Sequence, residues 1–263
     1  MTSSLQERFD FACATIKDAG ALALDYFNRF ETLKVKSKGV QDMASEADVE
    51  TQRLIEAAIV SRFPGDAFLG EEAPESYVAR PGVGTWIIDP IDGTQPFVNG
   101  IPSWCVSIAY VEGHEFRLGV VFDPKNDELF AAMAGAGATR NGQPIGASSA
   151  TSLADGLVSI GFSNRVTAAA TLEPLTRLMH ANGMFHRSGS GALSLAYVAA
   201  GRLIGYFEPH MNSWDFAASA LIIKEAGGVI NDCLPNEAAL VSGSLVLAAA
   251  PGVYDELNRI VFS

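Results

Sequence analysis

Apolar and polar positions repeat along the chain with two different periods. Over residues 5–30, apolar side chains recur every three or four positions, which predicts a long amphipathic helix. The same spacing predicts a second helix over residues 46–62, ending where Phe63-Pro64-Gly65 prevents further helix. Each helix should bury one face against a common core.

Short strand-like segments dominate the next part of the chain, at 67–70, 86–88, 104–111, 117–123 and 128–134. The turn sequences VEGHEF and DPKND should join the last three as hairpins, so we expect a largely antiparallel sheet behind the two helices. Residues 138–146 are expected to form a loop, in which Asn141-Gly142 suits positive φ.

The second half of the chain alternates strands with helices. Strands are expected at 156–160, 203–207, 228–232 and 245–249, and helices near 168–182, 191–200, 215–226 and from about 252. Such alternation predicts strands covered by helices on both faces. The expected fold class is therefore α/β with mixed α+β character, a layered αβαβα sandwich of helices and two sheets. One domain should span residues 1–263, with an N-terminal lobe of about 1–150 and a C-terminal lobe of about 151–263.

Composition narrows the function classes. The 263 residues are 48% hydrophobic, enough for a large core, and the formal net charge of −12 disfavours binding to nucleic acid or to an anionic membrane. The chain has three widely spaced cysteines, Cys13, Cys105 and Cys233, and no CxxC motif. We therefore expect buried thiols in a reducing compartment. The first residues lack a basic region followed by an apolar run, which predicts a cytoplasmic protein.

Carboxylates gather where strands end and helices begin, which is where α/β proteins build their sites. Most of them also have a purely structural explanation. Asp48 can complete a capping box with Ser45, adjacent glutamates in a loop are often solvated, and Asp215 can serve as an N-cap. The acids concerned are Asp48, Glu71, Glu72, Asp89, Asp92 and Asp215.

The segment WIIDPIDGT (86–94) is harder to explain by structure alone. Pro90 should stop the strand ladder and let Asp89, the Ile91 carbonyl and Asp92 converge. Gly93 then permits close backbone approach, and Thr94 can open a short helix whose N–H groups point at an anion. Two carboxylates and a carbonyl are hard oxygen ligands, the kind that Mg²⁺ or Mn²⁺ prefers.

Together these motifs resemble the inositol monophosphatase family of Mg²⁺-dependent, lithium-sensitive phosphatases. The strong matches are GEE (70–72), WIIDPIDGT (86–94) and WDFAASALIIKEAGG (214–228), and the weaker ones are DMASEAD (42–48) and GSGALSLAYVAAGRL (189–203). The resemblance covers nearly the whole chain. It implies that the fold is a sugar-phosphatase-like sandwich and that the protein is a phosphoric monoester hydrolase. It also implies a homodimer, the assembly that family members commonly form.

The resemblance also implies roles for individual residues. Two or three Mg²⁺ ions, or Mn²⁺, would be held by Glu71, Asp89, the Ile91 carbonyl, Asp92 and Asp215. Asp48 and Thr94 would orient and deprotonate the attacking water, Glu72 would support them, and the Gly93 and Thr94 amides would hold the phosphate. Lys36 lies in the loop that closes over the metals in the family, although three lysines in a loop can also serve solubility alone.

The residues that select the substrate are expected to lie outside the metal motifs. By resemblance the substrate contacts are Gly189, Ser190, Gly191 and Glu208, with Ser163 and Arg165 as further candidates. Glu208 would bind a polyol hydroxyl or be a plain surface glutamate, and His210 would touch substrate or pack beside Trp214.

The expected function is hydrolysis of a small polyol phosphate such as inositol 1-phosphate by two-metal activation of water. Histidinol phosphate is the alternative substrate, and nucleotides are disfavoured because no aromatic pair or basic cluster is evident. A different alternative is a family member that acts mainly as a regulatory binding protein.

Overall fold

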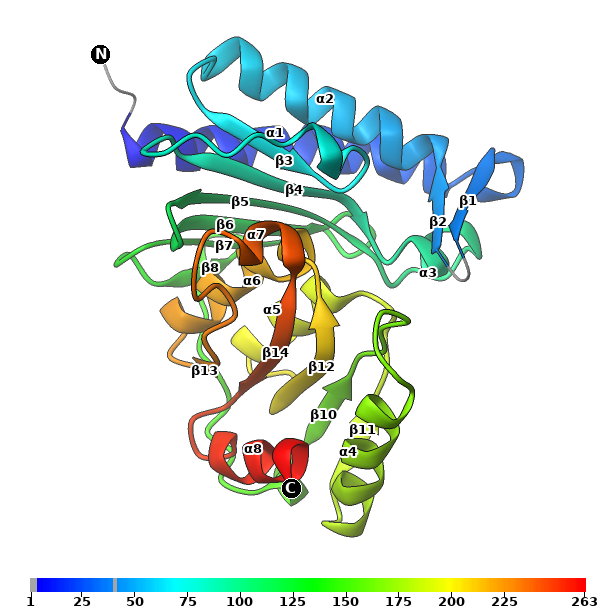
Figure 1. Ribbon diagram of the computed structural model, residues 1–263, viewed down its shortest axis with the longest axis vertical. Coiled ribbons are helices and arrows are strands. Elements are labelled where there is room, and N and C mark those ends of the chain that lie inside the picture. Colours follow the sequence, from blue (N-terminus) through cyan, green and yellow to red (C-terminus); the bar gives the residue numbers. More distant parts are fainter. Residues whose placement is uncertain (1–3, 40–41) are drawn as a thin grey trace.

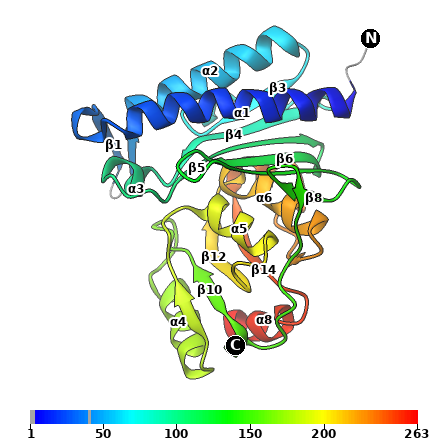
Figure 2. The ribbon, with the colours of Figure 1, turned by 180° about the vertical axis from the view of Figure 1, so that it is seen from behind.

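The computed structural model describes residues 4–39 and 42–263 and arranges them in five layers (Figure 1). Helices α1 (Leu5–Phe27) and α2 (Glu46–Arg62) cover a seven-stranded sheet, and α5 (Gly191–Ala199) and α6 (Ser213–Glu225) lie between it and a five-stranded sheet. Helices α4 (Ala169–His180) and α8 (Tyr254–Phe262) cover the far side of the second sheet, as the opposite view also shows (Figure 2). The predicted αβαβα sandwich is confirmed.

The first helical layer follows the apolar periodicity. Helix α2 has the predicted bounds, whereas α1 ends at Phe27 and is followed by a short 3₁₀ turn, Phe30–Thr32. Buried side chains such as Ile16 of α1 and Ile55 of α2 pack against Trp86 of the sheet. None of the helices in the described part of the chain combines the length and apolarity that a bilayer crossing needs.

The first sheet is largely antiparallel, as predicted, because only its first pair of strands is parallel. Its strands in spatial order are β3 (Ala67–Gly70), β4 (Thr85–Asp92), β5 (Cys105–Glu112), β6 (Glu115–Asp123), β7 (Glu128–Met133), β8 (Ala138–Arg140) and β9 (Gln143–Pro144). The prediction of a loop over 138–146 is wrong, since β8 and β9 form a hairpin there. Its turn has the predicted positive φ, 50° at Asn141 and 76° at Gly142.

A bulge in β4 sets the geometry of the site. Asp89 pairs with Ser107 and Asp92 with Cys105, so three steps along β4 match two steps along β5. The prediction that Pro90 ends the ladder is therefore wrong, because pairing resumes after it. In a regular strand Asp89 and Asp92 would face opposite sides of the sheet. The extra residue brings both carboxylates to the side of α6.

The second sheet has the order β11 (Met184–His186), β10 (Leu157–Ile160), β12 (Gly205–Met211), β14 (Ser244–Ala249), β13 (Val229–Ile230). Strand β10 is parallel to both of its neighbours, and β14 is antiparallel to its own. The predicted strands are all present. The division of the chain into two lobes at about residue 150 stays a prediction.

Several short elements were not predicted. They are the hairpin of β1 (Val35–Gly39) and β2 (Asp42–Ser45), strand β11 and helix α7 (Ala239–Ser242). Three to five residues are too few to show a period. The short helix expected at Thr94 is α3 (Thr94–Val98). All three cysteines are free thiols, with Cys105 and Cys233 buried and Cys13 partly buried. The side chain of Lys36 lies outside the described residues.

Candidate active site

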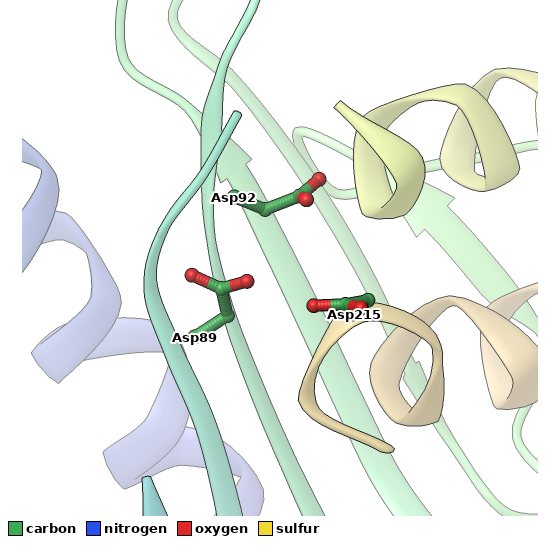
Figure 3. A group of neighbouring side chains, drawn as sticks. All are labelled: Asp89, Asp92 and Asp215. Carbon is green, nitrogen blue, oxygen red and sulfur yellow. The ribbon is translucent and has the colours of Figure 1, made fainter. Parts of the chain in front are cut away.

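Three carboxylates converge where the seven-stranded sheet meets helix α6. Asp89 and Asp92 come from the bulged end of β4, and Asp215 comes from the first turn of α6 (Figure 3). One carboxylate oxygen from each lies within 4.8 Å of the others. Asp89 is 1% exposed and Asp92 is 8% exposed, whereas Asp215 is partly open to solvent.

Each of these carboxylates has one oxygen held by a nearby donor. The Ile91 amide donates to Asp89 Oδ1 at 2.9 Å, and the Asn212 amide donates to Asp215 Oδ2 at 2.9 Å. Asp215 is therefore the third residue of a capping box whose N-cap is Asn212, and not the N-cap itself as the sequence suggested. These two backbone donors each bind a single oxygen of their carboxylate.

Asp92 is held by the first turn of α5. Its Oδ2 accepts a hydrogen bond from the Ala192 amide at 2.7 Å and another from the Ser190 hydroxyl. The thiol of Cys105 lies 3.8 Å from the same oxygen. Asp92 therefore joins β4 to α5, two elements that are far apart in the sequence.

The electrostatics of this cluster fit a divalent cation. Burial raises the pKa of Asp89, Asp92 and Asp215, and the neighbouring charges of Glu71, Asp92 and Asp215 raise the pKa of Asp89 further. Carboxylates this close repel one another unless a positive charge lies among them. Because the donors are hard oxygens, the set suits Mg²⁺ or Mn²⁺.

Asp48 and Thr94 form a second pair beside the cluster. The Thr94 hydroxyl lies 3.2 Å from both Asp48 Oδ1 and the Ile91 carbonyl oxygen. The other carboxylate oxygen of Asp48 accepts hydrogen bonds from the Ser45 amide at 2.7 Å and the Ser45 hydroxyl at 2.6 Å. The capping box is thus present, and it occupies only one of the two oxygens. Burial raises the pKa of Asp48 to about 6.

The adjacent glutamates, Glu71 and Glu72, follow β3. Glu71 acts on the cluster of three aspartates and Glu72 acts on Asp48. Glu71 acts on Asp89 through its charge and a side-chain hydrogen bond, although it lies outside the tight cluster of three. The negative charge of Glu72 raises the pKa of Asp48. The Glu72 amide donates to the buried Gln52 side chain of α2 at 2.9 Å, which fixes the path of the loop. Neither glutamate is simply a solvated surface residue.

Gly93 gives the chain the turn between strand and short helix. Its φ of 97° is left-handed, and a Cβ there would lie 2.8 Å from the Ser103 carbonyl oxygen. The backbone can therefore make this turn only with glycine. The amides of Gly93 and Thr94 follow directly after the bulge that carries Asp89 and Asp92.

A pocket of about 120 Å³ adjoins the carboxylates and contains the predicted substrate contacts. Gly189, Ser190, Gly191 and Glu208 all line it. Ser190 is 2% exposed and its hydroxyl is bonded to Asp92, so in this structure it holds a carboxylate. Glu208 lies in β12, where the Tyr206 hydroxyl donates to it and burial raises its pKa to about 7. Glu208 is therefore not a plain surface glutamate.

The remaining sequence candidates lie in an adjoining hollow of about 410 Å³, together with Glu71 and Thr94. The Ser163 side chain is buried, and its hydroxyl accepts a hydrogen bond from the Arg165 amide at 3.3 Å. His210 lines the same hollow, and its Nε2 lies 3.0 Å from the Ser242 carbonyl oxygen.

The chain matches known proteins over most of its length. Residues 4–261 match the inositol monophosphatase family. The chain belongs to this family. It is 37% identical over 247 residues to a Xylella fastidiosa protein named Nus factor SuhB, covering 89% of each chain. It is also 37% identical over 235 residues to an inositol-1-monophosphatase of Rhizobium meliloti, covering 89% of this chain and 88% of that one.

Among solved structures of the family's fold, the extragenic suppressor protein suhB from Bartonella henselae superposes with a TM-score of 0.86. The two chains are 30% identical, and the match covers 97% of this chain and 98% of the other. Membership of the inositol monophosphatase family supports a phosphatase.

Tyr206 and Arg187 are among the residues of the pocket that the family motifs do not include. Tyr206 lies two residues before Glu208 on β12, so strand alternation puts both on one face and could have identified it. Arg187 lines both the pocket and the hollow. It precedes Gly189 by two residues in an irregular segment, where the sequence carries no period to indicate which way a side chain points.

Proposed function

We propose that this protein is a Mg²⁺-dependent phosphomonoesterase that hydrolyses a small polyol phosphate such as inositol 1-phosphate. The observation that carries the proposal is the convergence of Asp89, Asp92 and Asp215 beside the hydrogen-bonded pair of Asp48 and Thr94. Family membership supports the phosphatase class. The polyol substrate and the mechanism below are our inference.

In this proposal two or three Mg²⁺ ions, or Mn²⁺, would be held by Glu71, Asp89, the Ile91 carbonyl, Asp92 and Asp215. Bound divalent ions of this kind lower the pKa of a water molecule and neutralise charge on a phosphoryl group and its leaving oxygen. The chain's own part is to fix the carboxylates, which it does through the amides of Ile91, Ala192 and Asn212.

Asp48 acts as the general base. A water molecule beside Thr94 passes a proton to the threonine oxygen as the Thr94 hydroxyl passes its own to Asp48 Oδ1. With a pKa of about 6, the Asp48 carboxylate is ionised at neutral pH and can accept it. The water oxygen bonds to phosphorus as the ester P–O bond breaks, and the leaving alkoxide takes a proton from solvent to give the alcohol. Asp48 then returns its proton to solvent, so that phosphate and an alcohol result.

Binding is assigned to the groups around this centre. The amides of Gly93 and Thr94 hold the phosphate, and Glu72 supports the water through its effect on Asp48. Glu208 accepts a hydrogen bond from a hydroxyl of the polyol, with Gly189 and Gly191 leaving room for the ring. No covalent intermediate is required, since phosphoryl transfer needs mainly positioning and charge neutralisation.

Phosphate release from purified protein tests the proposal. The substrates are inositol 1-phosphate, histidinol phosphate and fructose 1,6-bisphosphate, each with and without Mg²⁺ and with added Li⁺. We expect Mg²⁺-dependent release from a polyol phosphate that Li⁺ suppresses, and a homodimer in sedimentation. Release unaffected by chelation, or by Asp92→Asn, would contradict the mechanism. Preference for histidinol phosphate would replace the polyol by the alternative substrate.

A second candidate function is that of a regulatory binding protein. It is favoured by relatives such as the Xylella fastidiosa protein, which is named Nus factor SuhB. Because the formal net charge of −12 disfavours nucleic acid, the partner is expected to be a protein. Asp92→Asn separates the two functions, since a cellular phenotype that survives this substitution would not depend on catalysis.

A further inference from the structure

Tyr206 and Glu208 occupy alternate positions of β12, and both line the pocket that adjoins the carboxylates. Strand alternation puts the two side chains on one face of the sheet. The Tyr206 hydroxyl donates a hydrogen bond to Glu208 Oε2. Because Tyr206 is only 2% exposed, a buried phenol holds a carboxylate that lines a binding pocket.

The segment after β10 confines this pair. Gly161 follows β10, and its amide donates to the Phe207 carbonyl oxygen at 2.8 Å, which continues the parallel pairing with β12. A Cβ at Gly161 would overlap Glu208 Oε2 and would lie 2.7 Å from the Tyr206 hydroxyl oxygen. Real side chains do not come so close, so the carboxylate and the phenol are both packed against bare backbone.

Gly191, at the start of α5, also leaves room for the phenol. A Cβ there would lie 3.1 Å from the Tyr206 hydroxyl oxygen and 2.6 Å from Met211 Cε. Alanine at position 191 would therefore crowd the hydroxyl. A glycine in each of two neighbouring segments gives Tyr206 the space in which its hydroxyl meets Glu208.

The proton of this hydrogen bond belongs to the phenol. Burial raises the pKa of Tyr206 well above its usual value, and the charge of Glu208 raises it further, so Tyr206 stays protonated and donates. Burial raises the pKa of Glu208 to about 7, and the hydrogen bond from Tyr206 acts in the opposite direction. The bond thus favours the ionised carboxylate, which accepts hydrogen bonds more strongly than a neutral group does.

We infer that Tyr206 is a positioning residue: its hydrogen bond fixes the Glu208 carboxylate in the orientation that accepts a ring hydroxyl of the substrate. The inference rests on the proposed function, which assigns that hydroxyl to Glu208. Discrimination between a polyol phosphate and an ester without hydroxyls then depends on a carboxylate whose orientation is set by a buried phenol.

Binding to a silenced protein tests the inference without turnover. In Asp48→Asn with Mg²⁺, isothermal titration would compare inositol 1-phosphate with cyclohexyl phosphate, which has a ring of the same size and no hydroxyl. The ratio of the two affinities reports the contribution of the ring hydroxyls, since the phosphate is common to both esters. We expect Tyr206→Phe to lower this ratio about tenfold and to leave the affinity for cyclohexyl phosphate unchanged.

A double-mutant cycle tests whether Tyr206 acts through Glu208. Glu208→Gln should lower the same ratio, and Tyr206→Phe added to Glu208→Gln should lower it little further. Tyr110→Phe is the matched control, because this tyrosine of β5 is also buried but lines neither the pocket nor the adjoining hollow. A ratio that Tyr206→Phe leaves unchanged, losses that simply add, or an equal loss in Tyr110→Phe would overturn the inference.

The pH profile of the ratio is a readout that a merely structural role would not move. Because the Tyr206 hydrogen bond lowers the pKa of Glu208, its removal should keep the carboxylate protonated up to a higher pH. The ratio should therefore begin to fall at a higher pH in Tyr206→Phe than in its parent as the solution is acidified, and identical profiles would contradict the inference. The other charged or titratable groups around Glu208 are the same in both proteins: Asp92, Asp215, Arg165, Arg187, Glu71 and His210.

Failure of the proposed function would look different. If the wild-type protein released phosphate from no ester while the Tyr206-dependent ratio persisted, only the phosphatase proposal would be wrong. Turnover of inositol 1-phosphate with a ratio that Tyr206→Phe does not change would overturn only the role of Tyr206. Binding of neither ester would overturn both.

Discussion

The Oδ2 atom of Asp92 accepts hydrogen bonds from the Ser190 hydroxyl and from the Ala192 amide. These two bonds fix the orientation of the carboxylate beside Asp89 and Asp215. Groups that orient a metal ligand in this way commonly change metal affinity by 10- to 100-fold. Ser190 is thus a positioning residue in the proposed metal site.

Ser190→Ala should weaken Mg²⁺ binding about 10- to 100-fold in isothermal titration, because it removes one of these two donors. Ser190→Thr keeps a hydroxyl and should restore most of the affinity. Ser159→Ala is the control, since this buried hydroxyl bonds to Ser194 and not to Asp92. Equal losses in the two alanine variants would contradict a specific role for Ser190.

Asp48→Asn should lower kcat about 10²- to 10⁴-fold, the usual contribution of a general base. In the wild-type protein kcat should fall as the pH drops through about 6, because the Asp48 carboxylate becomes protonated there. The amide oxygen of Asn can still accept the Ser45 amide, so the melting temperature should change little. Retained activity in Asp48→Asn would show that another group takes the proton.

At the scale of single residues, the sequence identified which acidic residues belong to the site. It did not reveal that some of them have a structural and a functional role at once. Asp48 and Asp215 each satisfy a capping box with one oxygen and face the site with the other. Sequence reasoning treated the structural and functional explanations as alternatives, because a sequence does not distinguish the two oxygens of one carboxylate. Arg187 and the contact of Ser190 with Asp92 depend on contacts between distant segments, which no local pattern contains.

At the scale of elements, the bulge in β4 and the close packing of α6 on the sheet place the carboxylates. The sequence predicted both elements but not how they meet. A bulge is a mismatch between two strands, and residues 86–94 alone do not reveal what lies opposite them. The amide of the bulged residue Ile91 bonds to Asp89 and its carbonyl oxygen accepts from Thr94, so backbone groups at the bulge serve the site.

Helix α6 packs closely on the sheet at Gly119 of β6. A Cβ there would lie 2.8 Å from the Cα of Ala218, closer than real side chains come, so Gly119→Ala must push α6 outward. Overpacking of this kind costs about 1–3 kcal/mol, a fall of several degrees in melting temperature. Because α6 carries Asp215, Mg²⁺ affinity should fall as well.

Gly142→Ala is the matched control for that prediction. Its φ of 76° disfavours alanine by about 1–2 kcal/mol, but no atom crowds the site of the added Cβ. It should lower the melting temperature and leave Mg²⁺ affinity unchanged. Unchanged affinity in Gly119→Ala as well would show that α6 tolerates the shift.

At the scale of the whole molecule, the buried carboxylates make stability depend on pH and metal together. Burial raises the pKa of Asp48 to about 6 and also raises the pKa of Asp89, Asp92 and Asp215. Below about pH 4 the native and unfolded chains both hold these protons. As the pH rises, the unfolded chain releases them first, so the free energy of unfolding of the metal-free protein falls through pH 6 and above.

The melting temperature in EDTA should therefore be lower at pH 8 than at pH 5.5, and Mg²⁺ should raise it at pH 8 by binding the native state alone. Asp215→Asn removes one of the repelling charges. It should raise the metal-free melting temperature at pH 8 and reduce the effect of Mg²⁺. A melting temperature independent of pH in EDTA would contradict this account.

The layered architecture was predictable from periodicity because long elements dominate it, whereas the short elements around the site were not. Strand β11 has three residues, too few to show alternation, yet the segment after it carries Arg187 and Ser190. Functional parts of such a fold lie mostly in segments that follow strands, where local pattern is weakest.

The contact between Asp92 and the first turn of α5 joins residues that lie 98 and 100 positions apart. A chain made from its N-terminus therefore contains Asp92 long before the two groups, Ser190 and the Ala192 amide, that hold its carboxylate. Because contacts of such long range must overcome a large loop-closure entropy, we expect the metal site to be absent from the rate-limiting state of folding. Magnesium would then bind only after the rate-limiting step of folding. It would slow unfolding and leave the folding rate nearly unchanged.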